Sequence, residues 1–195
     1  MHRLLIATRN RHKTVELSSL LGATFCVEDL TAHPELPDVE ETGETFLDNA
    51  ILKALAASRH FGGELLVLAD DSGLAVDALE GAPGVRSARF AGEKATDRAN
   101  LDLLLTRLMG VAQRSARFRC VIAVAQGGEL KASFEGACEG TIIEAPRGEN
   151  GFGYDPVFVP AGETQTFAEL PAEVKNRLSH RAKATQLALA WLRGL

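Results

Sequence analysis

The chain has 195 residues, 46% of them hydrophobic and 24% charged, and a formal net charge of −5. This length suffices for one large domain or two small lobes with a sizeable core. The acidic balance disfavours a general nucleic-acid-binding surface, and the lack of a long apolar run argues against a transmembrane helix. Three widely spaced cysteines argue against a disulfide framework or a zinc cage and favour a reducing, cytoplasmic setting.

The N-terminal segment reads as a strand, a polar turn and a helix. The apolar run at residues 3–7 predicts the strand, and an apolar pattern that ends at Gly22 predicts the helix. Phosphate binds readily at such a turn, because free backbone N–H groups and the positive end of the helix dipole meet there. Thr8, Asn10 and Lys13 would add donors, although the glycines of a Walker motif are missing. A capped helix start with solvated basic residues explains the same pattern and is favoured on this segment alone.

A second helix is expected at about residues 46–59. Thr45 and Asp48 resemble a capping box, and Leu47, Ile51 and Leu55 mark an apolar face at i, i+4 spacing. The acidic pair Glu40 and Glu41 precedes this helix, and Asn49 and Lys53 project from one side of it. An exposed lysine is usually only solubilising, but beside such an amide and these acids it could reach a phosphate.

The chain is organised around residues 65–92, where a short apolar run is followed by Asp70 and Asp71. The run at residues 65–69 is typical of a strand buried on both faces. Ligands of open α/β sheets sit outside the carboxyl ends of strands, and two neighbouring carboxylates suit a hard divalent cation. An Asx-type turn with surface acids is the alternative.

The second half of the chain adds a helix, antiparallel strands and an unusual loop. Leu101, Leu104, Leu105 and Leu108 form a helical core stripe, and residues 116–125 and 130–137 read as a hairpin, with a further strand near 140–143. The loop GENGFGYDP at residues 148–156 carries Phe152 and Tyr154, which could stack on a nucleobase or pack beneath the loop. The pattern as a whole predicts a mixed α/β fold.

The last helix begins with two cationic residues. Ser179 caps it, His180 and Arg181 occupy its first turn, and Lys175 lies just upstream. A cation opposes the helix dipole at this position, so a ligand-contacting role gains weight. Acids, cations and aromatic residues together are the parts of a magnesium–nucleoside triphosphate site.

Five segments resemble, in order and over nearly the whole chain, the family of inosine/xanthosine triphosphate pyrophosphatases, the HAM1-like proteins. The segments are IATRNRHK, ETGETFLDNAILKA, ADDSGLAVDALEGAPGVRSARFAG, GFGYDP and KNRLSHRAKA. The resemblance implies an α/β fold with an elongated mixed sheet, flanking helices and two lobes around a central substrate cleft, in one domain over residues 1–195. It implies Mg²⁺-dependent hydrolysis of ITP, dITP and XTP to the monophosphate and pyrophosphate, a reaction that cleanses the nucleotide pool. It also implies a cytoplasmic homodimer that binds neither nucleic acid nor membrane.

The resemblance also implies roles for individual residues. Asp71 would be the general base and also a ligand of the metal. Either Glu40 or Glu41 would be a second ligand, and the resemblance does not decide between them. Thr8, Asn10 and Lys13, with Lys53, would bind the triphosphate, and Ser72 would lie beside the substrate. Phe152 would stack on the purine, and its pocket would be formed by Tyr154, Asp155, Lys175, His180 and Arg181. The other residues expected to bind the substrate are Arg9, Arg11, His12 and Gly153. Donors such as His180 and Arg181 suit the 6-oxo group of hypoxanthine and would face adenine's amine unpaired.

Two competing functions differ in class. One is a pyrophosphatase for pyrimidine or modified nucleotides, which a panel of triphosphates would separate. The other is a nucleotide-sensing module without chemistry, whose expected signature is loss of the metal-binding acids. Asp70, Asp71, Glu40 and Glu41 are all present, which favours catalysis.

Overall fold

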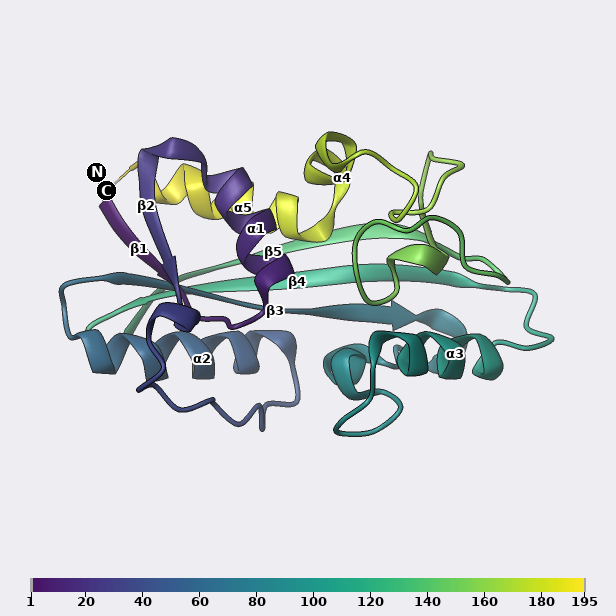
Figure 1. The fold of residues 1–195 in the computed structure, drawn as a ribbon, viewed down its shortest axis with the longest axis horizontal. Coiled ribbons are helices and arrows are strands. Elements are labelled where there is room, and N and C mark those ends of the chain that lie inside the picture. Colours follow the sequence, from purple (N-terminus) through teal and green to yellow (C-terminus); the bar gives the residue numbers. More distant parts are fainter. Residues whose placement is uncertain (1, 195) are drawn as a thin grey trace. The chain divides into compact units, whose positions relative to one another are not determined.

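The computed structural model describes residues 2–194 as a mixed α/β fold, with helices flanking a six-stranded sheet (Figure 1). The strand order is β2-β1-β3-β4-β5-β6. The strands are β1 (His2–Ile6), β2 (Phe25–Asp29), β3 (Leu66–Val76), β4 (Ser115–Gln126), β5 (Glu129–Ile142) and β6 (Phe158–Pro160). The helices are α1 (Arg11–Leu21), α2 (Phe46–Phe61), α3 (Asp97–Arg107), α4 (Ala172–Leu178) and α5 (His180–Leu192). The expected mixed sheet with flanking helices is confirmed.

The chain divides into two compact units. Unit 1 comprises Met1–Asp71, Cys120–Gly136 and Arg181–Leu195, and unit 2 comprises Ser72–Arg119 and Ala137–His180. Each unit has its own buried apolar cluster. The single domain and the substrate cleft expected from the resemblance stay predictions.

Unit 1 is built on parallel strands. β1 pairs in parallel with both β2 and β3, and α1 and α5 cover one face of these strands while α2 covers the other (Figure 1). Leu5 and Val67 are fully buried, as are Ile6 and Leu68, their neighbours along the strands. Successive strand residues face opposite sides of a sheet, so both faces of the sheet are buried here. This explains the uninterrupted apolar runs in these segments.

The buried face of α2 differs from the predicted one. The helix and its capping box are confirmed, since Thr45 Oγ1 accepts from the Asp48 N–H (3.1 Å) and Asp48 Oδ2 accepts from the Thr45 N–H (3.2 Å). Leu47, however, is 40% exposed. The buried residues are mostly small and include Phe46, Asn49, Ala50, Ala54, Ala57 and Ser58. Small side chains let a helix pack closely against its neighbours. Because the buried face differs from the predicted one, Asn49 is buried and Lys53 is half-buried.

Strand β3 continues beyond its predicted end. It was expected to stop before Asp70, but it runs to Val76 with Leu74 and Val76 fully buried. Asp70 and Asp71 therefore lie within the strand and not in a turn beyond it. Gly73 also packs closely within the strand, since a Cβ there would collide with Ser87 and the Gly84 carbonyl.

Unit 2 surrounds an aromatic and leucine-rich core. Leu101, Leu104 and Leu108 of the α3 segment are buried, as the predicted stripe required. β5 pairs antiparallel with the short strand β6. The strand predicted near residues 140–143 is the end of β5, and the sequence patterns did not predict α4.

The predicted hairpin is confirmed as β4 and β5. Gly127 and Gly128 join the strands with φ values of 60° and 80°. Two successive positive φ angles are those of a type I′ turn, which matches the twist of hairpin strands and favours glycine.

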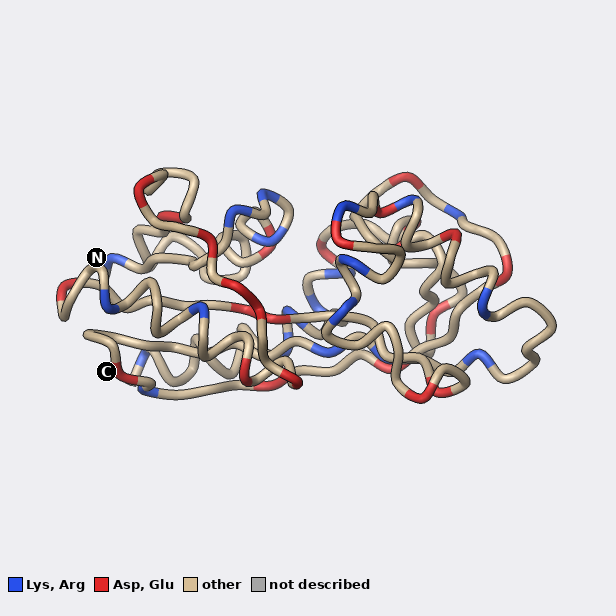
Figure 2. The backbone as a smooth tube through the Cα atoms, turned by 90° about the horizontal axis from the view of Figure 1, so that it is seen from below, with Lys and Arg blue, Asp and Glu red and all other residues tan. Residues whose placement is uncertain are grey.

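Acidic and basic residues are interspersed along both units (Figure 2). Within residues 2–194, every helix is too short or too polar to cross a membrane.

Candidate active site

The turn between β1 and α1 is organised by side-chain capping. Thr8 Oγ1 accepts from the Asn10 N–H (3.1 Å), and Asn10 Oδ1 accepts from the N–H groups of His12 (3.0 Å) and Lys13 (3.3 Å). These bonds satisfy donors that every helix start leaves without an intrahelical partner. The capped-helix interpretation of this segment thus holds for Thr8 and Asn10, whose phosphate role stays a prediction.

The basic residues of this turn diverge. Arg9 donates to the carbonyls of His33 (3.3 Å) and Leu36 (2.5 Å) and lies 3.6 Å from Asp38, so it fastens the loop after β2. Arg11 and His12 are exposed. Lys13 extends toward β3, where its Nζ lies 3.1 Å from Asp70 Oδ1.

The two aspartates of β3 serve separate clusters. Because side chains alternate along a strand, Asp70 and Asp71 project from opposite faces of the sheet. Asp70 meets Lys13 of α1 and Arg181 of α5, whereas Asp71 meets Lys53 of α2. The binding of one cation by these neighbouring carboxylates stays a prediction, because each has a different lysine as its direct partner.

Asp70 is the centre of a buried ionic cluster. Its side chain is fully buried, and Oδ2 accepts from Arg181 Nε (3.3 Å) and Nη2 (3.2 Å). Arg181 also lies 2.5 Å from Glu16 Oε2, through Nη1. Burial favours the neutral acid, but Lys13, Arg181 and Lys53 outweigh it and hold the pKa of Asp70 far below its usual range. Asp70 is consequently a fixed negative charge.

Asp71 has a different electrostatic setting. Its Oδ1 accepts from Lys53 Nζ (2.8 Å) and its Oδ2 from Asn49 Nδ2 (3.4 Å). Burial is the largest influence and raises the pKa of Asp71, although Lys53 acts against it. The surrounding carboxylates in turn raise the pKa of Lys53 in spite of its own burial. Asp71 is thus the more readily protonated member of the aspartate pair.

Glu41, and not Glu40, joins the Asp71 cluster. Glu41 Oε1 lies 2.8 Å from Lys53 Nζ, so one ammonium group bridges two carboxylates, whereas Glu40 is exposed. Within residues 2–194, no group of three or more His, Cys, Asp or Glu side chains is arranged to hold a metal ion. Two carboxylates nevertheless fit Mg²⁺, which keeps several waters and uses one or two protein carboxylates together with substrate phosphates. The carboxylates of Glu41 and Asp71, which both contact Lys53, therefore suit such an ion.

Three of the residues predicted to surround the purine, Phe152, Asp155 and Lys175, form a cluster within unit 2. Asp155 is buried, and its Oδ2 accepts from Lys175 Nζ (2.7 Å) and from the Phe152 N–H (3.0 Å). The Lys175 ammonium lies 5.2 Å from the centre of the Phe152 ring, within the range of a cation–π contact. Gly153 donates to Asp97 (2.8 Å). The aromatic loop is therefore tied down at several points.

Tyr154 packs beneath this loop. It is buried, and its hydroxyl donates to the Ser87 carbonyl (2.9 Å). Of the two uses proposed for the loop aromatics, plain packing describes Tyr154, while Phe152 is only half-buried. Ser72 is half-buried at the start of unit 2, and its substrate role stays a prediction.

His180 and Arg181 have different surroundings although they are consecutive. The His180 ring stacks on Phe118 in unit 2, with ring centroids 4.8 Å apart. The guanidinium of Arg181 is engaged by Asp70 and Glu16 in unit 1. The base-reading roles of both residues stay predictions.

Comparison with known proteins identifies the family. Residues 4–191 match the model of the Ham1 family. The chain belongs to this family. A dITP/XTP pyrophosphatase of Desulforamulus reducens is 53% identical over 196 residues, covering 99% of this chain and 96% of that protein. A HAM1 protein from Coxiella burnetii superposes with a TM-score of 0.89 at 39% identity, covering 100% of both chains. A nucleoside-triphosphatase / dITP/XTP pyrophosphatase from Mycobacterium abscessus superposes with a TM-score of 0.76 at 44% identity, covering 99% of this chain and 100% of that one.

Two residues, Glu16 and Phe118, join the clusters without having been predicted as site residues. Asp70 was predicted as a member of an acidic pair that suits a cation, but its contacts with Lys13 and Arg181 were not predicted. Consecutive residues of a strand face opposite sides of the sheet, so the sequence could have predicted that Asp70 and Asp71 have different partners. Glu16 and Arg181 are 165 positions apart, so no local pattern connects them.

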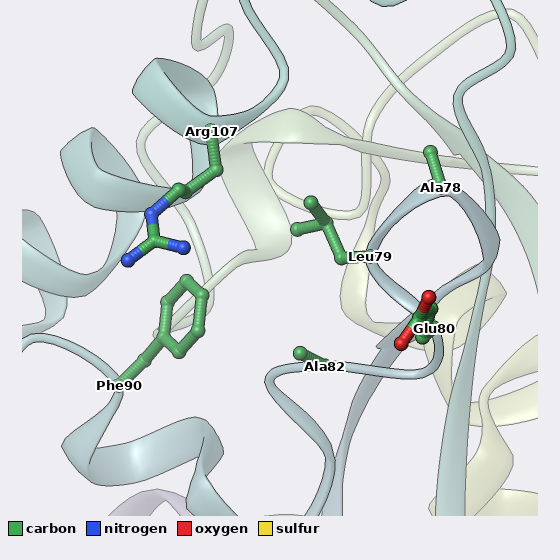
Figure 3. Close-up of a pocket in the computed structure, with 6 residues that line it drawn as sticks. All are labelled: Ala78, Leu79, Glu80, Ala82, Phe90 and Arg107. Atoms are coloured by element: carbon green, nitrogen blue, oxygen red, sulfur yellow. The ribbon is translucent and has the colours of Figure 1, made fainter.

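A further depression lies elsewhere in unit 2 of this Ham1 protein (Figure 3). Its volume is about 270 Å³, and its lining is Ala78, Leu79, Glu80, Ala82, Phe90 and Arg107. None of these six is a predicted site residue.

Proposed function

We propose that this chain is a nucleoside-triphosphate pyrophosphatase that converts ITP, dITP and XTP to the monophosphate and pyrophosphate in a Mg²⁺-dependent reaction. The observation that carries the proposal is the 53% identity to a dITP/XTP pyrophosphatase across 99% of this chain. The buried acid–cation clusters around Asp70 and Asp71 support it, because phosphoryl chemistry needs fixed cations and a proton acceptor close together.

Lys13 and Lys53 are the proposed phosphate ligands. Both ammonium groups are held by buried carboxylates in unit 1, which orients them before substrate arrives. A positioned cation stabilises a phosphate anion without the cost of ordering a free side chain. On substrate binding, each ammonium would share its donors between its carboxylate and a phosphate oxygen.

Asp71 is the proposed general base. A general base must lie within reach of the attacking water, and in the metal-free protein burial raises the pKa of the Asp71 carboxyl. Its amide partner Asn49 and its ammonium partner Lys53 fix the direction of the carboxylate. Asp71 would orient the attacking water and accept its proton.

Glu41 and Asp71 are the proposed holders of Mg²⁺. The ion would supply charge neutralisation at the phosphates and act as a Lewis acid. Lys53, which contacts both carboxylates, would share its N–H donors between them and the triphosphate.

The unit 2 cluster is the proposed purine site. Phe152 would stack on the base, with the Lys175 ammonium held beside it by Asp155. Lys175 and His180 would donate to the 6-oxo group of hypoxanthine or xanthine. Adenine carries an amine there, and a buried donor left unpaired costs about 1–3 kcal/mol, or roughly 5- to 150-fold in binding.

Pyrophosphate release from ITP, XTP, GTP, ATP and dUTP with Mg²⁺ tests this function, with Asp71→Asn as the control for contaminating activity. Strong release from ITP and XTP, weak release from GTP and ATP, and no release without Mg²⁺ are expected. Binding of ITP without turnover would indicate a sensor, and a preference for dUTP would contradict the purine site.

The family resemblance also carries three broader proposals. The protein acts as a homodimer in the cytoplasm, and it keeps these nucleotides out of DNA and RNA. Light scattering of the purified protein tests the dimer, and the mutation rate of a deletion strain tests the protective role.

A further inference from the structure

A stacked pair of rings joins β4 to the start of α5 within unit 2. The rings of Phe118 and His180 have centroids 4.8 Å apart and planes inclined by only 11°. Phe118 is 7% exposed and His180 is 5% exposed. The contact is therefore a face-to-face stack in a buried setting, and it opposes rotation of the imidazole out of this plane.

Phe118 belongs to a larger aromatic layer. The Phe158 ring meets it edge-on with centroids 4.7 Å apart, and the Phe167 ring lies 6.0 Å away. Phe167 also lies 5.7 Å below the Lys175 ammonium. One layer of rings thus contacts both His180 and Lys175, the two cationic or polar side chains proposed to meet the base.

We propose that Phe118 is a positioning residue for base recognition, which fixes the plane of the His180 imidazole so that its N–H group can meet the 6-oxo group of the purine. This inference rests on the proposed function, in which His180 contacts the base. A ring held in one plane loses little freedom when it forms a directional hydrogen bond. A leucine in place of Phe118 would fill much of the space without presenting a flat face.

The test compares Phe118→Leu with Phe90→Leu. Phe90 lies in the same unit, packs against the same apolar core and lines the separate depression in Figure 3, so it controls for loss of a packed ring. Affinity for inosine monophosphate is measured by titration without metal. We expect Phe118→Leu to weaken it about fivefold, in line with the strength of an aromatic pair, and Phe90→Leu to leave it unchanged.

Two further readouts separate positioning from stability. The His180 ring protons, assigned by comparison with His180→Gln, should be shifted upfield in the wild-type NMR spectrum and lose that shift in Phe118→Leu. In turnover, Phe118→Leu should raise KM for ITP and narrow the preference for ITP over ATP by a similar factor, with kcat within about twofold. Phe118→Tyr, which keeps the flat ring, should restore most of the preference.

The outcomes are decisive for Phe118 whatever the enzyme's activity. Equal weakening of inosine monophosphate binding by the two leucine variants, no weakening by Phe118→Leu, or no binding to the wild-type protein would overturn the inference. Failure of the wild-type protein to hydrolyse any purine triphosphate would overturn the proposed function, while the titration and the NMR shift would still decide the role of Phe118.

Discussion

Substitution of Asp70 by Asn should destabilise unit 1 far more than the same change at Asp71. Asp70 is fully buried and is held below its usual pKa by Lys13 and Arg181. Removing one member of a buried ion pair costs about 3–5 kcal/mol, because the remaining charge is left uncompensated. Arg181 is 2% exposed and keeps Glu16 as a partner, so we expect the lower end, about 3 kcal/mol.

Asp71→Asn should change stability by roughly 1 kcal/mol or less, since burial already disfavours the ionised carboxylate and Lys53 retains Glu41. Urea unfolding followed by fluorescence measures both effects. The single tryptophan, Trp191, lies in α5 of unit 1 and reports on that unit. Asp70→Asn should lower the midpoint by roughly 1–3 M. Equal losses in the two variants, or a loss below about 1 kcal/mol for Asp70→Asn, would refute the reasoning.

The pH dependence of the two variants gives an independent check. The pKa of Asp70 is lower in the folded state than in the unfolded state, where it is about 3.9. The ionised carboxylate therefore contributes its full stabilisation of the folded protein above that pH and loses it as the pH falls toward the folded-state pKa. The gap between wild type and Asp70→Asn should therefore be constant near neutrality and shrink below about pH 4. The folded-state pKa of Asp71 is raised, so its ionised form lowers stability at neutral pH and this effect is relieved on acidification.

Three further changes probe the site and the fold. Asp71→Asn should leave ITP binding within a few-fold while lowering kcat by about 10²–10⁴-fold; near-full turnover would remove Asp71 as the base. Lys13→Ala should raise KM for ITP by roughly 10- to 100-fold, from loss of a charge-assisted hydrogen bond, and barely alter inosine affinity; equal effects on both ligands would argue against a phosphate role. Thr45→Ala, which removes the α2 cap, should lower the unfolding free energy by about 1 kcal/mol; an unchanged urea midpoint would contradict this.

Local patterns predicted most of the elements correctly. The strand–turn–helix start, the capping box of α2, the leucine stripe of α3 and the β4–β5 hairpin all follow from contacts between residues close in sequence. The buried face of α2 could not be predicted from apolar side chains alone. Close packing against the strands selected alanine over leucine there, and this tertiary effect has no signature in an apolar periodicity.

The site was predicted as a set of residues but not as an arrangement. Lys53, Glu41 and Asp71 were each predicted as site residues and contact one another, as do Phe152, Asp155 and Lys175. Arg9 instead holds the loop after β2, and the partnership of Glu16 with Arg181 depends on segments far apart in the chain. Contacts of this kind are decided by how elements pack, which the order of residues along one segment does not encode.

The pleat of β3 has a consequence for how such a protein can change over generations. Because Asp70 and Asp71 face opposite sides, the charge that holds α1 and α5 in place and the carboxylate assigned to chemistry occupy adjacent codons yet different neighbourhoods. A replacement at position 71 can alter reactivity without loosening the packing on the other face. A one-residue insertion or deletion before this point in β3 would turn each side chain to the opposite face and disturb both positions at once, so we expect it to be more damaging than a substitution.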